Sequence, residues 1–203
     1  MQVTQLKNAF AITGPLLMYV GNLERYQGID LLLESFQLAL SQVSEAHLVI
    51  IGGAPEHIEQ YQQRSQQLGI AAHVHFIGKR PVEQLADYLG QADILVSPRT
   101  QGNNTPMKLY SYLDSGKALL ATDLPTHTQV LNHQVAWLSL PEAEAFSQGM
   151  VNLIQDPALR EQLGHEARAL IAQNHTYDAF ASKLTGLYDW LQLQLLGDTP
   201  QPA

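Results

Sequence analysis

Short apolar runs, each followed by glycine or a polar loop, constrain the fold of this chain more than any other feature. The runs are Leu16–Val20, His47–Ile51, Val74–Ile77, Ile94–Val96, Ala118–Ala121 and Val135–Leu138. They are apolar throughout rather than alternating, as is typical of strands that are buried on both faces. Segments with helical spacing separate them: Gly28–Leu40, Pro55–Leu68, a helix opened by Pro81, Pro106–Asp114 and Thr126–Asn132. We therefore expect an α/β fold, a Rossmann-like doubly wound parallel sheet of about six strands.

The remainder of the chain, from Pro141 onward, has only helical patterns. Asp156, before Pro157, and Thr176 are placed as helix N-caps, and the last helix is expected over Tyr177–Leu196. We expect residues 1–14 to be a linker or a truncated stub. Residues 15–197 should form one Rossmann-like domain with extra C-terminal helices, and residues 198–203 a flexible tail.

Composition excludes several classes of protein. The formal charge is −8, from 11 basic and 19 acidic residues, which argues against a nucleic-acid partner. No apolar run approaches the roughly 18 residues of a membrane span. The chain has no cysteine, which removes disulfides and thiolate metal sites and suits a reducing compartment. We therefore expect a cytoplasmic protein.

Basic residues gather where the predicted strands end. Lys79 and Arg80 follow the third strand, and Arg99 and Lys108 flank the loop after the fourth. Ligands of an open parallel sheet bind at this edge, where helix N-termini favour anions. Thr105 as N-cap and Pro106 as first helical residue would start the helix that carries Lys108. These features predict a site for a phosphate-bearing ligand, although each alone also suits an ordinary turn or a solvated surface.

Histidines and known motifs narrow the chemistry. His73 and His75 share a strand face, but no carboxylate stands beside them at metal-ligand spacing, so we expect no metal site. His127 follows the fifth strand and is placed to reach the cleft. The sequence contains no G-x-S-x-G, Walker A or G-x-G-x-x-G motif. A serine hydrolase, a P-loop ATPase and a typical dinucleotide dehydrogenase are therefore disfavoured.

Four segments in order resemble a known family. They read "LLMYVGNLERYQGIDLLLESF", "HLVIIGG", "VHFIGKRPVEQLADYLGQADILVSPR" and "NTPMKLYSYLDSGKALLATD". They are similar to the C-terminal, donor-binding domain of GT-B glycosyltransferases in the retaining group 1 (family 4) set. The resemblance covers roughly Leu16 to Leu196. It implies a domain that binds a nucleotide sugar, while a separate N-terminal domain binds the acceptor.

The resemblance also implies roles for individual residues. The loop "GNLERYQG" corresponds to the family's diphosphate loop, "GKR" to the place where the base is held, and "NNTPMK" to the cradle of diphosphate and sugar. Lys108 and Arg99 are the expected catalytic residues. The expected donor-binding residues are Gly21, Asn22, Gln27, Gly53, Lys79, Arg80, Asn104, Thr105, Pro106, Met107, Lys108 and Ser111.

Departures from the family pattern are informative. Asn22 and Gln27 stand where the family often has Arg and Lys, and Ser111 stands at the glutamate that grips the ribose hydroxyls. The partner carboxylate would fall at Asn103. A full enzyme of this kind needs two such domains and about twice this length. The chain is therefore expected to be a donor-binding half, poorly active or inactive alone.

The resulting hypothesis is a donor domain that binds UDP or a UDP-sugar for hexosyl transfer, with no metal and no other cofactor. Two alternatives stay open at this point. One is a sugar-nucleotide epimerase or hydrolase on the same plan, for which His127 is the only candidate proton-transfer group. The other is a non-catalytic interaction domain that has lost its ligand.

Overall fold

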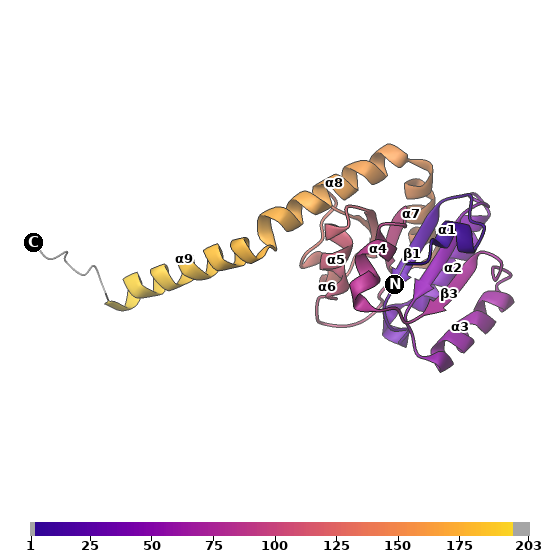
Figure 1. The fold of residues 1–203 in the computed structure, drawn as a ribbon, viewed down its shortest axis with the longest axis horizontal. Helices are drawn as coiled ribbons and strands as arrows, with labels where there is room; N and C mark the ends of the chain where they lie inside the picture. The colour runs from indigo at the N-terminus through magenta and orange to yellow at the C-terminus, as the bar shows by residue number, and fades with distance from the viewer. Residues whose placement is uncertain (1–2, 197–203) are drawn as a thin grey trace, which may run out of the picture.

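The computed structural model describes residues 3–196, and its centre is one six-stranded parallel sheet (Figure 1). The strands are β1 (Leu16–Val20), β2 (His47–Ile51), β3 (Val74–Gly78), β4 (Ile94–Ser97), β5 (Ala118–Thr122) and β6 (Trp137–Ser139). They are ordered β3-β2-β1-β4-β5-β6, and every neighbouring pair is parallel. The strand order reverses between β1 and β4, which is where ligands of such sheets bind. The predicted fold class is confirmed.

Both faces of the sheet are covered, which explains the uniformly apolar strands. Leu17 and Tyr19 of β1 pack with α2 (Ile29–Leu40), α3 (Pro55–Gln67) and α7 (Ala143–Gln155) on one face. Leu16 and Met18 face the other side, with α1 (Leu6–Ala9), α4 (Leu85–Leu89), α5 (Lys108–Asp114) and α8 (Pro157–Asn174). The remaining elements are two short 3-10 helices, η1 (Arg25–Gln27) and η2 (Val82–Gln84), with α6 (Pro125–Thr128) and α9 (Tyr177–Leu196).

The start of α5 differs from the prediction. The helix begins at Lys108, and Met107 occupies the N-cap position with helical backbone angles and no side-chain capping bond. The Thr105 hydroxyl instead donates to Gln129 Oε1 at 2.6 Å. Thr105 as N-cap and Pro106 as first helical residue are therefore wrong, because a partner distant in sequence takes the hydroxyl.

The region between β5 and β6 also differs. α6 ends at Thr128, whereas the sequence predicts a helix over Thr126–Asn132. The amides of Val135 and Ala136 donate to the Asn132 carbonyl at 3.2 and 3.1 Å. Val135 and Ala136, the first residues of the apolar run, therefore belong to this turn. β6 comprises Trp137–Ser139 instead of the predicted Val135–Leu138.

The segment before β1 is packed onto the domain. Leu6 is fully buried, and its amide donates to Gln91 Oε1 at 2.7 Å. Lys7 pairs with Asp93 at 2.9 Å, and the Phe10 ring stacks on His75 with centroids 4.3 Å apart. Within the predicted linker of residues 1–14, the described part is thus tied to the sheet, and residues 1–2 lie outside it.

The C-terminal helices confirm both predicted caps. Asp156 Oδ1 accepts from the Leu159 amide at 2.9 Å, and Thr176 Oγ1 accepts from the Ala179 amide at 3.2 Å. α9 then runs away from the domain as a separate rod (Figure 1). The predicted tail of residues 198–203 lies outside the described residues. None of the helices described in residues 3–196 combines the length and apolarity that crossing a membrane requires.

Candidate functional site

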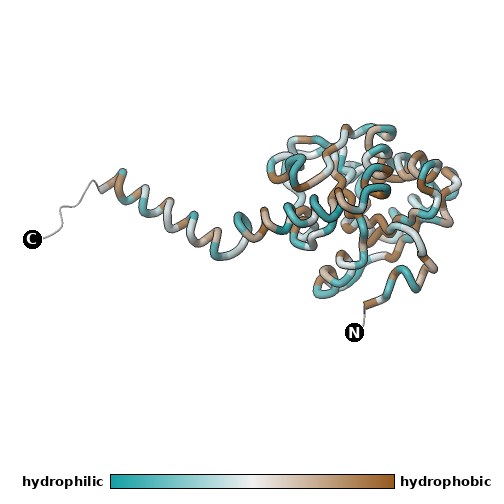
Figure 2. The backbone as a smooth tube through the Cα atoms, turned by 90° about the horizontal axis from the view of Figure 1, so that it is seen from above, coloured by the Kyte–Doolittle hydropathy of each residue, from teal (hydrophilic) through white to brown (hydrophobic). Residues whose placement is uncertain are grey.

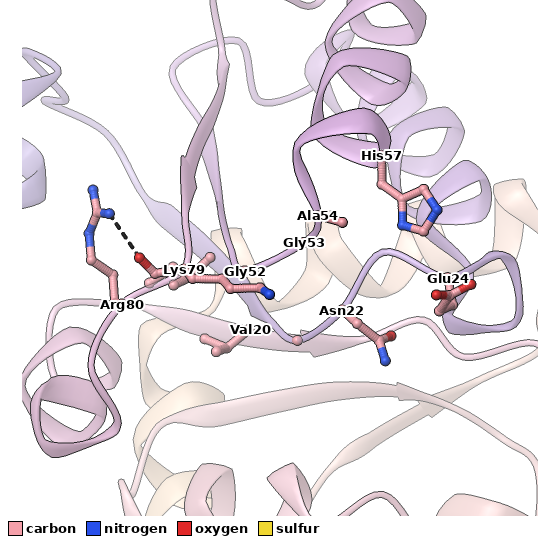
Figure 3. A pocket seen from close by; sticks show the side chains of 11 residues that line it. Val20, Asn22, Glu24, Gly52, Gly53, Ala54, His57, Lys79 and Arg80 are labelled. Atoms are coloured by element: carbon pink, nitrogen blue, oxygen red, sulfur yellow. Dashed lines mark hydrogen bonds between the residues drawn. The ribbon is translucent and has the colours of Figure 1, made fainter.

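The loops that follow β1, β2 and β3 enclose a cleft of about 420 Å³ at the carboxyl edge of the sheet (Figure 3). Its lining residues are Val20, Gly21, Asn22, Glu24, Ile51, Gly52, Gly53, Ala54, His57, Lys79 and Arg80. In Figure 3 the Lys79 side chain extends toward the cleft, whereas Arg80 turns away from it. The Arg80 guanidinium donates to the Lys79 carbonyl at 3.1 Å. Of this predicted basic pair, Lys79 points into the cleft and the Arg80 guanidinium lies at its margin.

The ammonium group of Lys108 lies beside this cleft, although Lys108 is the first residue of α5, which follows β4. Its Nζ is 3.3 Å from Gln27 Oε1 and 4.0 Å from the centroid of the Tyr19 ring. A Cβ placed on Gly21 would lie 3.3 Å from the same nitrogen. The structure thus brings together three predicted residues, Gly21, Gln27 and Lys108, from segments about 80 positions apart in the chain.

Lys108 has no anionic partner within the described residues. The ion pairs there join Lys7 to Asp93, Arg64 to Glu34 and His165 to Glu166. Burial, and to a lesser degree the positive charge of Arg99, lowers the pKa of Lys108 from 10.5 to about 7. An anion bound at this point would restore the charged form, because an opposite charge nearby favours ionisation.

Arg99, the second predicted catalytic residue, is directed into its own loop. It is 5% exposed, and its guanidinium donates to the Gln101 carbonyl and to both oxygens of Asn104. The amide of Thr100 donates to the Tyr26 carbonyl at 3.0 Å, which joins this loop to the one after β1. Arg99 is therefore close to the site but bound to its scaffold.

The other predicted residues of this loop lie outside the cleft that β1–β3 enclose. Asn104 is exposed and Pro106 is buried just before α5. Met107, 77% exposed, and Ser111 line a second groove of about 800 Å³ between α5 and the junction of α8 with α9. Ser111 thus lines a different hollow from the cleft beside which Lys108 lies.

His127 does not reach the cleft, which corrects the expectation from sequence. It is 0% exposed, with Nε2 2.9 Å from Ser97 Oγ and Nδ1 2.8 Å from the Thr122 carbonyl oxygen. Burial lowers its pKa from 6.5 to about 4. A neutral imidazole with both nitrogens engaged serves packing, so the epimerase hypothesis loses its candidate proton-transfer group.

Some residues of the site carry no signal in the sequence. Tyr19 lies in an apolar strand run and reads as core, yet its hydroxyl donates to the Asn22 carbonyl at 2.7 Å and lies 3.3 Å from Gln27 Oε1. Glu24 and His57 line the cleft from positions that resemble ordinary loop and helix residues. In residues 3–196, no group of three or more His, Cys, Asp or Glu side chains is arranged to hold a metal ion.

A family model agrees with this geometry. Residues 4–170 match the family described as "Glycosyl transferases group 1", which is most of the chain. The chain belongs to the group 1 glycosyl transferases. The C-terminal domain of such a protein from Francisella tularensis (LpcC) superposes with a TM-score of 0.74 at 17% identity, covering 87% of this chain and 95% of that one. This group 1 glycosyl transferase therefore has the fold of a GT-B C-terminal domain, as the resemblance implied.

Two curated relatives are longer than this chain. The phosphatidyl-myo-inositol mannosyltransferase of Mycobacterium tuberculosis is 24% identical over 183 residues, which cover 87% of this chain and 47% of that protein. The D-inositol 3-phosphate glycosyltransferase of Corynebacterium diphtheriae is 28% identical over 189 residues, 85% of this chain and 42% of its own length. This glycosyl transferase chain thus spans less than half of these curated relatives.

A solved structure with a nucleotide bound shows the same fold. Anabaena Alr3699/HepE in complex with UDP superposes with a TM-score of 0.79 at 16% identity, covering 91% of this chain and 51% of that one. The likeness establishes the fold of the glycosyl transferase domain.

Proposed function

We propose that this chain is the donor-binding domain of a retaining glycosyltransferase that transfers a hexosyl group from a UDP-sugar. The observation that carries the proposal is the Lys108 ammonium, half-buried beside Gly21 and without a carboxylate partner in the described residues. Withdrawing a cation from water without a counterion is costly unless a ligand supplies the negative charge. Structures similar to this chain contain UDP or UDP-glucose, which supports the choice of nucleotide.

In this proposal the ligand spans the carboxyl edge of the sheet. The diphosphate lies near Gly21, Asn22 and Lys108, and the base lies toward Lys79 in the cleft that both loops line. The hexosyl group lies toward the loop that holds Asn104 and Thr105. Since Ser111 replaces the ribose glutamate and lines the other groove, the ribose hydroxyls are held without that carboxylate.

The mechanism follows from where charge develops. Departure of the diphosphate leaves an oxocarbenium-like sugar and a leaving group with added negative charge. A fixed cation at that leaving group stabilises the transition state, which is the largest single contribution in many enzymes. Lys108 performs this role, assisted by backbone amides of the 105–108 segment, and the reaction needs no metal ion. The acceptor binds to a further domain of the intact enzyme, so this chain alone transfers sugar poorly.

Calorimetry with UDP tests the role of Lys108. Removal of a charged hydrogen-bond partner costs about 1.5–3 kcal/mol, so Lys108→Ala should weaken UDP binding roughly 10- to 150-fold. Lys7→Ala is the matched control, because Lys7, on α1, makes a surface ion pair with Asp93. Equal affinities of wild type and Lys108→Ala would remove Lys108 from the site.

A thermal-shift panel of UDP, GDP, ADP and CMP tests the ligand class. A ligand that binds only the folded state must raise the melting temperature. Stabilisation by UDP above the other nucleotides is the expected outcome. No stabilisation by any of them would favour the domain that has lost its ligand.

A further inference from the structure

The loop between β4 and α5 is built around one buried guanidinium. Arg99 Nε donates to the Gln101 carbonyl at 2.7 Å. Its two terminal nitrogens donate to the carbonyl and the side-chain oxygen of Asn104, at 2.9 and 3.1 Å. Arginine presents its donors as a rigid planar fork, so these bonds define the positions of the acceptors as well as their distance.

The backbone of the loop lies directly on the guanidinium. A Cβ at Gly102 would lie 2.4 Å from one terminal nitrogen of Arg99 and 2.7 Å from its Cζ. Gly102 also has a φ of +126°, in the region that favours glycine. Residues 101–104 therefore wrap the arginine head group closely on several sides.

Arg99 also joins this loop to the loop after β1. Its Cζ is 5.1 Å from the centroid of the Tyr26 ring, and the Thr100 amide donates to the Tyr26 carbonyl at 3.0 Å. From the other side, Thr122 Oγ1 donates to the Arg99 carbonyl at 2.6 Å. Three strand exits, those of β1, β4 and β5, meet at this residue.

We propose that Arg99 is a positioning residue, which shapes the loop of residues 100–104 and holds it against the β1 loop, and does not itself contact the ligand. This inference rests on the proposed function, which places the donor sugar at this loop and the diphosphate at the β1 loop to which it is joined. All three nitrogens of the Arg99 guanidinium donate to oxygens of Gln101 and Asn104 in its own loop. The Lys108 ammonium, in contrast, has Gln27 Oε1 as its only hydrogen-bond partner among the described residues. In this proposal Arg99 positions the loop, and Lys108 binds the anion.

The test compares Arg99→Lys and Arg99→Met with wild type in the full chain, by amide hydrogen exchange without ligand and by calorimetry with UDP. A lysine keeps the charge but cannot make three planar bonds. We expect amides of residues 100–105 to exchange at least about tenfold faster in both variants, and UDP affinity to fall about tenfold in both. Unchanged exchange in both, with affinity lost in Arg99→Met and kept in Arg99→Lys, would show a direct charge contact and overturn the proposal.

Arg160→Lys is the matched control, because the Arg160 guanidinium also donates to backbone carbonyls, those of Leu153 and Ile154 at 2.6 and 2.8 Å. It should loosen the end of α7 and leave UDP affinity unchanged.

If either Arg99 variant fails to fold, Asn104→Ala replaces it, since Asn104 is exposed and its side chain supplies one of the two acceptors that it offers to Arg99. This variant should speed exchange in the same loop by a smaller factor, and no change would equally overturn the proposal. Failure of wild type to bind UDP would reject the proposed function, while the exchange data would still report on Arg99.

Discussion

The loops at the carboxyl edge of the sheet and the helix α9 are built on opposite principles. At the edge, polar side chains are buried and bonded to partners far along the chain, as His127 is to Ser97. α9 projects from the domain (Figure 2). It exposes large apolar side chains along its length. These are Tyr177, Phe180, Leu184, Leu187, Tyr188, Trp190, Leu193 and Leu195.

This contrast separates the part of the molecule whose conformation depends on contacts between distant segments from the part whose conformation depends on local interactions. The edge loops depend on packing between segments, so a single added methyl group should disturb them. α9 depends on its own backbone hydrogen bonds and helix propensity, since little of it touches the domain. Substitutions should therefore act strongly at the edge and weakly in α9, and the following experiments measure that contrast.

Gly28→Ala should have the largest effect on stability. Gly28 has a φ of +75°, and an added Cβ would lie 1.9 Å from the Pro98 carbonyl oxygen. The left-handed conformation and the displaced loop should together reduce the free energy of unfolding by about 2–5 kcal/mol, measured by urea denaturation. Gly69→Ala is the control, because Gly69 has a φ of +71° with no atom within 4 Å of the added Cβ. Equal losses in both variants would mean that the edge loops are not tightly packed together.

His127→Leu should come next. The substitution leaves Ser97 Oγ without its imidazole partner in a fully buried position, which should cost about 1–3 kcal/mol of unfolding free energy. It should also change the dependence of stability on pH. The folded-state pKa of His127, about 4, lies below the unfolded value of 6.5, so wild type loses stability as pH falls from 6.5 toward 4.

The slope of that loss should be smaller in His127→Leu. It should not vanish, because burial also lowers the pKa of His75 to about 4 and adds to the same window. Urea titrations at several pH values provide the measurement. An unaltered slope would show that His127 is accessible to protons in the folded state.

UDP affinity should fall as the pH rises above 7. The pKa of Lys108 in the free domain is about 7, and a bound diphosphate favours its charged form. Above that value the affinity should decrease by up to about tenfold per pH unit, and binding should take up a proton. Calorimetry in buffers of different ionisation enthalpy measures both effects, with Lys108→Met as control. A flat profile from pH 7 to 9 in wild type would contradict the role given to Lys108.

Gly186→Ala in α9 should have the smallest effect, and of opposite sign. An added Cβ at Gly186 meets no atom within 4 Å, so the higher helix propensity of alanine should stabilise α9 by about 0.5–1 kcal/mol. Circular dichroism on heating should show this, with UDP affinity unchanged. Gly164→Ala in α8 is the contrast, because its Cβ would lie 2.0 Å from the Gly116 carbonyl oxygen and should destabilise the domain. Stabilisation by both would mean that α8 is as loosely packed as α9.

Strand positions were predictable because burial on both faces leaves a strong local pattern. Leu16–Val20 and His47–Ile51 agree with the structure to the residue. The predicted bounds of β6 were wrong because Val135, in an apolar run that is continuous in the sequence, belongs to the turn at Asn132. Thr105 failed as a cap for a related reason: Gln129, distant in sequence, binds its hydroxyl.

The amino-acid sequence by itself determined the parallel α/β architecture and the strand exits at which basic residues gather. Hydrophobic periodicity and glycine positions express these locally. Only the tertiary structure decided that Lys108 meets Gln27, that Arg99 is turned into its own loop and that His127 is buried. The physical reason is that a side chain's partners, and hence its charge and availability, depend on atoms brought close by packing between distant segments, which no local pattern encodes.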